Sequence, residues 1–317
     1  MHRVNINEAL SLLQAGELVV IPTETVYGLG ADATSGAAVE RVYRYKNRPA
    51  DNPLICHFAD LAQISEYAEV SPLARALFEN FAPGPLTVLL PVKDTRLRAA
   101  TRGQTKVGCR IPAASTTLEL IRRFNRPIAA PSANPSTFPS STNEEMALAY
   151  FAHLSGGVLG GQPARIGLES AIVDLEGDTV TILRAGSIGV AELKKELSKN
   201  TKVLLGTRGQ ATPGQKDRHY SPKTPVYKIT ALSEFPTDPK AVLLTTKTHA
   251  ATVTFPVVIL APHYTPSLIA ARLYATLLAL DKGDYSAAYW YLPELDLANN
   301  PSSLEVALQE KLKKILQ

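Results

Sequence analysis

The sequence lacks the features typical of disulfide-stabilised, zinc-binding or membrane-spanning proteins. Its 317 residues include only two cysteines, Cys56 and Cys109, and both stand in apolar, strand-like segments. We therefore expect small buried side chains in a reducing compartment, without a disulfide or metal site. No run approaches the ~20 apolar residues of a membrane helix, and the first residues show no apolar signal-peptide core. The protein is thus expected to be cytoplasmic, with no membrane contact.

Several common nucleotide-binding and catalytic motifs are also missing. There is no GxxxxGK[ST] loop, no GxGxxG after a strand, no HExxH, no GxSxG and no paired CxxC. The glycine-rich run at 156–161 lacks the lysine that would reach phosphates, so we interpret it as a turn between elements. Neither a common phosphate-binding loop nor a zinc site is expected.

Composition and charge are those of an ordinary folded protein. Hydrophobic residues make up 45% and charged residues 20%, and the formal net charge is +4. This mild positive charge suits an acidic small substrate or a weak nucleic-acid contact without requiring either. A chain of this length usually forms two domains.

Hydrophobic periodicity predicts a mixed α/β domain, a linker and a smaller parallel-sheet domain. In the first domain we expect strands at 18–21, 54–58, 87–92, 107–111, 128–130, 171–175, 180–183 and 203–205. Its helices are expected at 7–14, 37–45, 73–81, 116–124, 143–153 and 190–197. In the second domain, strands at 226–229, 241–245, 257–260 and 287–292 alternate with helices, notably 267–280 and 303–316. The Gly- and Pro-containing linker sets the boundaries at 1–205, 206–225 and 226–317.

Four polar segments are candidates for a binding site, and the first is residues 22–30, Pro-Thr-Glu-Thr-Val-Tyr-Gly-Leu-Gly. It is a polar turn directly after a buried strand, where open α/β sheets tend to bind ligands. A purely structural turn, with Gly28 and Gly30 at positive φ, is the competing interpretation.

The second segment, residues 46–57, places Lys46 and Arg48 at a helix end and His57 inside the next strand. Polyphosphate is bound by such cations, lysine as a point charge and arginine as a bidentate fork. Cations that complement the helix dipole and a satisfied core histidine would explain the same residues.

In the third segment, residues 106–112, Arg110 interrupts an apolar strand. Its burial would be costly without an anionic partner. A substrate carboxylate or an internal salt bridge would serve equally well.

The fourth segment is a hydroxyl-rich loop, residues 129–136, followed by Ser140, Ser141 and Thr142. Backbone N–H groups and hydroxyls in such a loop can hold phosphate or carboxylate oxygens. Helix capping by Thr142 or Asn143 explains only the last residues.

Taken in order, these segments resemble the threonylcarbamoyl-AMP synthase family of Sua5 and YrdC-like proteins. Similar elements continue at 167–174, 182–186 and 213–222, and the last of these indicates the longer Sua5 form. The resemblance covers nearly the whole first domain. It implies an α/β fold, with a YrdC-like mixed twisted sheet followed by a small Rossmann-like Sua5 C-terminal domain.

The resemblance also implies roles for individual residues, none of which would become covalently modified. L-Threonine would be surrounded by Thr25, His57, Arg110, Ser132 and Ser170, with Arg110 on its carboxylate. ATP would be contacted by Lys46, Arg48, Asn52, Lys106, Ala130, Ser140, Arg184 and Tyr220. Mg2+ would accompany the triphosphate mainly through its phosphates, and the resemblance names no protein ligand for it.

The implied activity is that of a nucleotidyltransferase. L-Threonine, bicarbonate and ATP would give threonylcarbamoyl-AMP and diphosphate, the first step of tRNA N6-threonylcarbamoyladenosine synthesis. The product would pass to a tRNA threonylcarbamoyltransferase complex, and a weak tRNA contact fits the mild positive charge. Residues 213–220 would form a lid over the nucleotide, because carbamates and adenylates must be kept from water.

Three residues depart from the family pattern. Ala171 stands where threonine is usual, Lys106 where a hydroxyl is common, and Cys109 where an aliphatic is usual. Lys106 could add a phosphate contact of its own. Two other functions compete: an RNA-binding module, which normally shows clustered basic and aromatic residues, and an enzyme using carbamate derived from carbamoyl phosphate.

Overall fold

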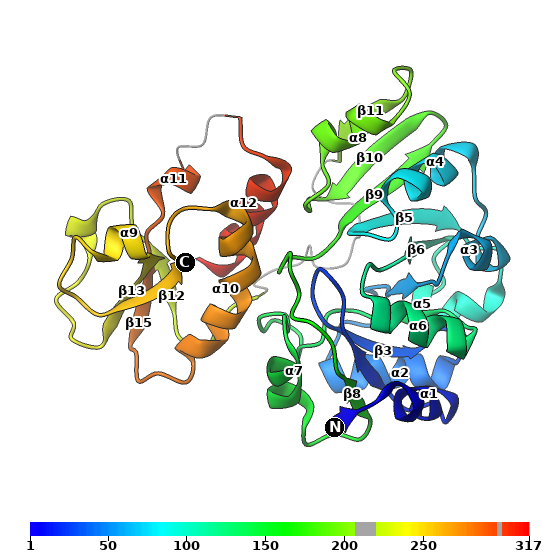
Figure 1. The fold of residues 1–317 in the computed structure, drawn as a ribbon, viewed down its shortest axis with the longest axis horizontal. Helices are drawn as coiled ribbons and strands as arrows, with labels where there is room; N and C mark the ends of the chain where they lie inside the picture. Colours follow the sequence, from blue (N-terminus) through cyan, green and yellow to red (C-terminus); the bar gives the residue numbers. More distant parts are fainter. Residues whose placement is uncertain (207–219, 297–299, 317) are drawn as a thin grey trace.

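The computed structural model describes residues 1–206, 220–296 and 300–316. Two separate β-sheets divide this part of the chain, one with eleven strands between residues 2 and 205 and one with four between residues 226 and 290. We call the parts that carry them the N-terminal unit and the C-terminal unit. Figure 1 shows the C-terminal unit, coloured yellow to red, packed on one flank of the larger N-terminal unit.

The large sheet is mixed and has the order β1-β8-β2-β3-β7-β4-β6-β5-β9-β10-β11. Its strands are β1 (His2–Val4), β2 (Val19–Ile21), β3 (Gly28–Asp32), β4 (Ile55–His57), β5 (Leu86–Pro91), β6 (Lys106–Arg110), β7 (Ile128–Ala129), β8 (Gly157–Leu159), β9 (Ala171–Glu176), β10 (Thr179–Arg184) and β11 (Lys202–Leu205). β4 runs parallel to β6, whereas β5 runs antiparallel to it. The mixed α/β fold expected from the sequence is confirmed.

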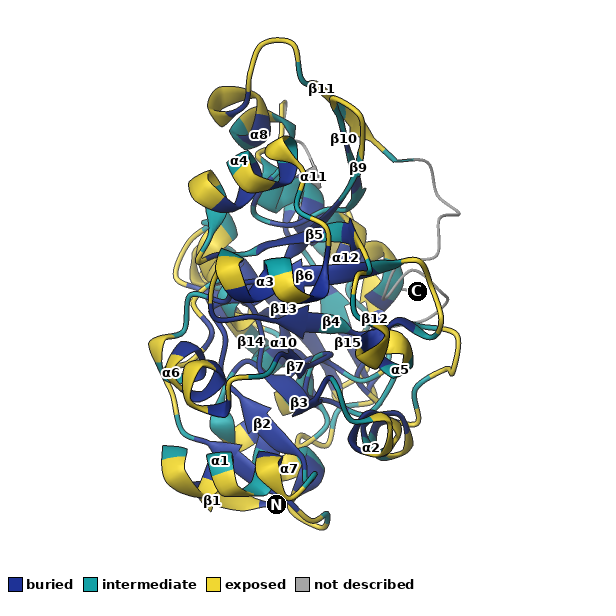
Figure 2. Ribbon diagram, turned by 90° about the vertical axis from the view of Figure 1, so that its right-hand side faces the viewer, coloured by how far each residue is buried: buried dark blue, intermediate teal, exposed yellow. Residues whose placement is uncertain are grey.

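Helices cover both sides of this sheet. They are α1 (Ile6–Gln14), α2 (Gly36–Lys46), α3 (Leu61–Tyr67), α4 (Pro72–Phe81), η1 (Thr95–Leu97), α5 (Arg98–Thr101), α6 (Ser115–Phe124), α7 (Glu144–Phe151) and α8 (Val190–Glu196). Asn5 begins α1 with a capping box, and Ser71 caps α4 ahead of a proline in its first turn. Helix α1 packs on α6 and α2 packs on α5, on opposite sides of the strands in Figure 2.

The two cysteines face each other across neighbouring strands of this sheet. Cys56 of β4 and Cys109 of β6 are partners in the parallel register, and both are buried and free. Burial raises the pKa of both thiols, that of Cys56 to about 12, which keeps them protonated. They are the small buried side chains that the sequence predicts.

The interpretation of two glycine-containing segments as turns was wrong. Gly28 begins β3, neither Gly28 nor Gly30 has a positive φ, and the glycine run at 156–161 contains β8. These glycines are needed for close packing: a Cβ on Gly30 would lie 2.8 Å from Ile128 Cγ2, and one on Gly157 would lie 2.7 Å from Val4 Cγ2. The polar turn before β3 is correspondingly short and ends at Tyr27.

The small sheet is entirely parallel, as the alternation of strands and helices predicts, with the order β12-β15-β13-β14. Its elements are β12 (Val226–Lys228), η2 (Leu232–Glu234), β13 (Ala241–Thr246), α9 (Lys247–Ala250), β14 (Val257–Ala261), α10 (Pro266–Leu280), β15 (Ala287–Trp290), α11 (Pro293–Asp296) and α12 (Ser303–Ile315). Within the described ranges, no helix is both long enough and apolar enough to cross a membrane.

The two units share a hydrophobic core. Figure 1 shows α10 and α12 on the side of the C-terminal unit that faces the N-terminal unit. Val26, Met146 and Leu168 of the N-terminal unit belong to the same buried cluster as the residues of these helices. Burial of apolar surface therefore fixes how the units sit against each other.

Candidate functional site

One pocket gathers residues from all four segments that the sequence singles out. It encloses about 790 Å³ of empty space, part of it open to solvent. Its lining comprises Thr23, Thr25, Val26, Tyr27, Gly28, Lys46, Arg48, Asn52, Pro53, Ile55, His57, Arg110, Ala130, Pro131, Ser132, Asn134, Ser136, Thr137, Phe138, Glu169, Ser170, Arg184 and Tyr220. Segments far apart in the sequence therefore meet at one place.

The five residues expected to bind threonine all line this pocket. Thr25 lies in the turn between β2 and β3, and Ser132 follows β7 and bridges to Gly28 of β3. His57 and Arg110 end the parallel strands β4 and β6 and are register partners. Their side chains therefore emerge at the same edge of the sheet, the edge where α/β folds bind ligands.

Arg110 is buried and paired with a glutamate of its own unit. Its Nη2 donates to Glu24 Oε1 at 2.8 Å, and its Nε donates to the Gly84 carbonyl at 3.2 Å. Burial raises the pKa of Glu24, but the Arg110 charge and hydrogen bonds outweigh it, so that the net pKa is lowered. Nη1 makes no hydrogen bond to any residue in the described ranges and is left for a ligand. Arg110 can therefore form the internal salt bridge and still have a nitrogen for a substrate carboxylate.

The pocket hydroxyls are held by other hydroxyls. Thr25 Oγ1 lies 2.8 Å from Thr23 Oγ1, and Ser170 Oγ lies 2.8 Å from Thr87 Oγ1. Each hydroxyl oxygen already has one hydrogen-bonding neighbour. The direction in which the hydroxyl can bond to a ligand is therefore set before the ligand binds.

His57 is a neutral imidazole at physiological pH. Burial and then the charge of Arg110 lower its pKa to about 3. Its Nδ1 is buried and has no hydrogen-bond partner in the described part of the chain. A buried polar atom without a partner costs free energy, and a bound polar ligand would relieve that cost.

Lys46 is a buried lysine that forms no ion pair with a carboxylate in the described ranges, although the charge of Glu169 acts on it. It lies at the last turn of α2, and its Nζ donates to the carbonyls of Ser132, at 2.5 Å, and of Asn134. Burial, and next the charge of Arg48, lower its pKa well below the usual value. An anionic ligand would favour the charged form.

Arg48 is held in place by the loop that follows it. Its Nη2 donates to Asn52 Oδ1 at 2.7 Å and to the Pro53 carbonyl at 2.9 Å. Burial lowers its pKa to about 10, so the guanidinium stays charged at neutral pH. With Lys46 it forms a positive wall that suits phosphate oxygens.

Arg184, at the end of β10, also lines the pocket. Its Nε donates to the Ser170 carbonyl at 2.9 Å and its Nη2 to Ser170 Oγ at 3.1 Å. Burial lowers its pKa, and the Glu169 carboxylate opposes that shift. The cation thus links the residues expected to bind threonine with those expected to bind ATP.

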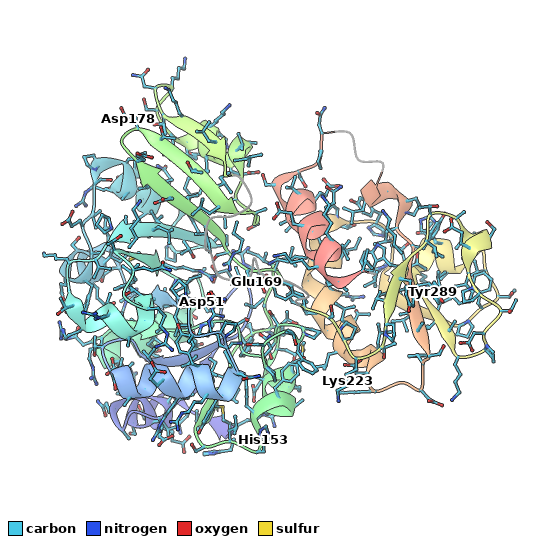
Figure 3. All side chains as sticks on the ribbon, turned by 180° about the vertical axis from the view of Figure 1, so that it is seen from behind. Asp51, His153, Glu169, Asp178, Lys223 and Tyr289 are labelled. Carbon is cyan, nitrogen blue, oxygen red and sulfur yellow. The ribbon has the colours of Figure 1, made fainter. Side chains whose placement is uncertain are left out.

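Glu169 is a charged residue of the pocket to which sequence reasoning assigned no role. It is labelled in Figure 3, between the two units, and Ser140 Oγ donates to its Oε1 at 2.8 Å. Burial raises its pKa, but the charges of Lys311 and then Arg184 outweigh burial and lower the pKa to about 2. Its position directly before Ser170 was the signal available in the sequence.

Two residues expected to contact ATP are not among those that line the pocket. Ser140 is buried behind Glu169. Lys106 lies at the opposite end of β6 from Arg110, and its Nζ pairs with Asp174 and donates to the Leu175 carbonyl at 3.3 Å. The phosphate contact of Lys106 stays a prediction that this arrangement does not favour. Residues 213–219 of the expected lid lie outside the described residues.

Comparisons with known proteins identify the family. The family model described as telomere recombination, Sua5/YciO/YrdC, matches residues 11–186, and that of the threonylcarbamoyl-AMP synthase C-terminal domain matches residues 183–314. Threonylcarbamoyl-AMP synthases of Pyrococcus abyssi and Bacillus subtilis are each 39% identical, over 227 and 236 residues respectively. Each alignment covers 70% of this chain, and 66% and 65% of the relatives.

A solved structure covers the whole chain. The crystal structure of P. abyssi Sua5 complexed with L-threonine superimposes with a TM-score of 0.84 at 30% identity. The match covers 100% of this chain and 99% of that one. Both units and their arrangement are therefore shared with that structure.

Proposed function

This chain belongs to the Sua5/YciO/YrdC family, and we propose that it is a threonylcarbamoyl-AMP synthase. The reaction joins L-threonine, bicarbonate and ATP and releases diphosphate. The observation that carries the proposal is that one pocket combines an amino-acid-sized set of hydroxyls and Arg110 with the separate cations Lys46, Arg48 and Arg184. The relatives named above are threonylcarbamoyl-AMP synthases, and the solved relative binds L-threonine, which supports the same assignment.

The amino acid would occupy the side of the pocket around Arg110. We propose that the carboxylate takes the free Nη1 of Arg110 and that Thr25, Ser132 and Ser170 hold the remaining polar atoms. Neutral His57 presents its unpartnered Nδ1 to the same space. Serine differs from threonine by one methyl group. An apolar contact with that methyl group would favour threonine over serine by only about 1–3 kcal/mol.

The nucleotide would occupy the side lined by the remaining cations. We propose that Lys46, Arg48 and Arg184 meet the phosphates and that Asn52, the Ala130 backbone and Tyr220 complete the site, with Ser140 acting through Glu169. The three cations offset much of the charge of a triphosphate. The Lys106 contact would require its ammonium to leave Asp174.

Catalysis would rest on position and charge. The amine and bicarbonate form a carbamate and release water, and a carbamate oxygen then bonds to the α-phosphorus while the bond to the β-phosphate oxygen breaks. Holding the attacking and leaving oxygens in line and neutralising phosphate charge is the main requirement of such a step. The pocket offers fixed cations and hydroxyls for this, and no covalent intermediate on the protein is needed.

Mg2+ would enter with the nucleotide. In the described residues there is no group of three or more His, Cys, Asp and Glu side chains that could hold a metal ion. Glu169, which lines the pocket, is already paired with Lys311, and Glu24, which lies beside the pocket, is already paired with Arg110. The donor set therefore fits a metal carried by ATP phosphates, where the ion would neutralise phosphate charge.

We propose three further assignments on the family resemblance. Residues 1–205 would be the catalytic domain, 206–225 a linker and lid, and 226–317 the Sua5 C-terminal domain. The product would be passed, in the cytoplasm, to a tRNA threonylcarbamoyltransferase complex. A weak tRNA contact would accompany this transfer.

The decisive test is diphosphate release from ATP with Mg2+, with L-threonine and bicarbonate omitted in turn. Release that requires both is the expected result. Release that continues without either would reject the proposed reaction.

A further inference from the structure

The C-terminal unit contributes buried polar groups to the pocket wall. Lys311 of α12 places its Nζ 2.6 Å from Glu169 Oε2, and Tyr274 of α10 donates to the same oxygen at 3.1 Å. Glu169 in turn lines the pocket. The contact is tight: Gly167 has φ +77°, and a Cβ there would lie 2.2 Å from the Ala270 carbonyl oxygen of α10.

Lys311 also holds Tyr220, the pocket residue that begins the second described stretch. Its Nζ donates to Tyr220 Oη at 3.1 Å and lies 4.4 Å from the centre of the Tyr220 ring. The ring stacks on Tyr274 at a centroid distance of 5.3 Å. The next residue is fixed to the pocket loop, because Ser221 N donates to the Thr137 carbonyl at 3.0 Å.

The backbone of Tyr220 indicates that these contacts are needed. Its φ is 68°, a left-handed conformation that a bulky side chain rarely adopts. Such a conformation persists only where surrounding contacts determine it. The contacts that do so include the ammonium of Lys311 and the ring of Tyr274, both from the C-terminal unit.

The burial of Lys311 indicates that this residue does more than stabilise the contact between the two units. The Lys311 side chain is 5% exposed and that of Glu169 is 8% exposed. A buried ion pair contributes little net stability compared with apolar residues of the same size, so its presence needs another reason. Here one partner lines the pocket and the other holds a second pocket residue.

We propose that Lys311 is a positioning residue of the nucleotide side of the pocket, acting through Glu169 and Tyr220, so that the C-terminal unit completes this site. Loss of its ammonium would leave Glu169 as an uncompensated anion beside the cations expected to meet the phosphates. It would also remove the hydrogen bond that Lys311 donates to Tyr220. The naming of ATP as the ligand rests on the proposed function, whereas the arrangement of the groups does not.

The test compares Lys311→Met with Lys313→Met in the full chain. Lys313 lies on the same helix, is exposed and loses the same charge when substituted. We expect Lys311→Met to weaken ATP binding about tenfold or more in titration calorimetry, with L-threonine affinity within about twofold of wild type. In turnover, KM for ATP should rise while KM for threonine stays constant. Lys313→Met should leave both affinities and both KM values unchanged.

A variant that simply misfolds would behave differently, because a reduced active fraction lowers kcat and leaves both KM values unchanged. Should Lys311→Met not fold, the double variant Lys311→Met/Glu169→Gln removes the uncompensated buried charge. The inference expects the double variant to keep weakened ATP binding, because the hydrogen bond from Lys311 to Tyr220 is still missing. ATP binding at wild-type strength in either folded variant would overturn this inference but would leave the proposed function standing. A wild-type protein that binds no ATP would overturn the proposed function and this inference together.

Discussion

Two buried ion pairs border the pocket, and they differ in how much of the chain they require. Arg110 and Glu24 belong to the N-terminal unit, whereas Lys311 and Glu169 join the two units. In each pair the glutamate directly precedes a pocket hydroxyl, Thr25 or Ser170. On the proposed assignment of ligands, the amino-acid side of the pocket would form once the N-terminal unit folds, whereas the nucleotide side would also need the docked C-terminal unit.

The largest effect should come from breaking the pair that lies within one unit. Arg110→Gln removes the guanidinium and leaves Glu24 buried and unpaired, a change that typically costs about 3–5 kcal/mol. We expect kcat/KM for L-threonine to fall by at least about a hundredfold (~2.7 kcal/mol), with ATP binding reduced far less. Arg122→Gln, a substitution at an exposed position on α6, is the matched control. Equal losses in threonine and ATP affinity would contradict the division into two sides.

Acidification should break the pair between the units next. The folded-state pKa of Glu169 is about 2, below its ordinary value of 4.5. Its contribution to stability is therefore present above pH ~4.5 and is lost as the pH falls from about 4.5 towards 2. Urea-unfolding midpoints across this range should show a steeper acid loss for wild type than for Glu169→Gln.

The control for that titration is Glu79→Gln, which changes an exposed carboxylate of α4. It should leave the acid slope of wild type unchanged. If Glu169→Gln had the same slope as wild type, the interdomain carboxylate would not be the titrating group.

A smaller effect is expected from Lys46, on the nucleotide side. Burial lowers its pKa well below the usual value, so the free protein favours the neutral amine as the pH rises, and a bound triphosphate favours the ammonium. ATP binding should therefore take up protons at any pH above the pKa that Lys46 has in the free protein, and ATP affinity should decrease as the pH rises further. Calorimetry in two buffers of different ionisation enthalpy measures the uptake. Uptake that persists in Lys46→Met would assign it to another group.

The smallest effect is expected at Lys106, which lies outside both sides of the pocket. Because its ammonium pairs with Asp174, Lys106→Ala should change the dissociation constant for ATP by less than about twofold. A tenfold loss would instead support the phosphate contact expected from the family resemblance.

The success of the sequence predictions depended on how local each signal was. Most helices and strands follow from periodicity, such as α6 at Ser115–Phe124 and the parallel strands of the C-terminal unit. The strands β3 and β8 were missed because glycines add nothing to the hydrophobic alternation that indicates a strand. The need for glycine at these positions becomes visible only from the side chains that pack against them. The five residues expected to bind threonine do meet in one pocket, because motif order across the chain constrained them jointly.

The sequence by itself determined the family, the two-unit organisation and the residue types that the pocket would need. Only the tertiary structure decided which buried charged residues form ion pairs with each other. Arg110 pairs with Glu24, which lies 86 positions earlier in the sequence, and Lys311 pairs with Glu169 across the boundary between the units. The physical reason is that the free energy of a buried charge depends on the few atoms around it, which come from distant segments and leave no local pattern in the chain.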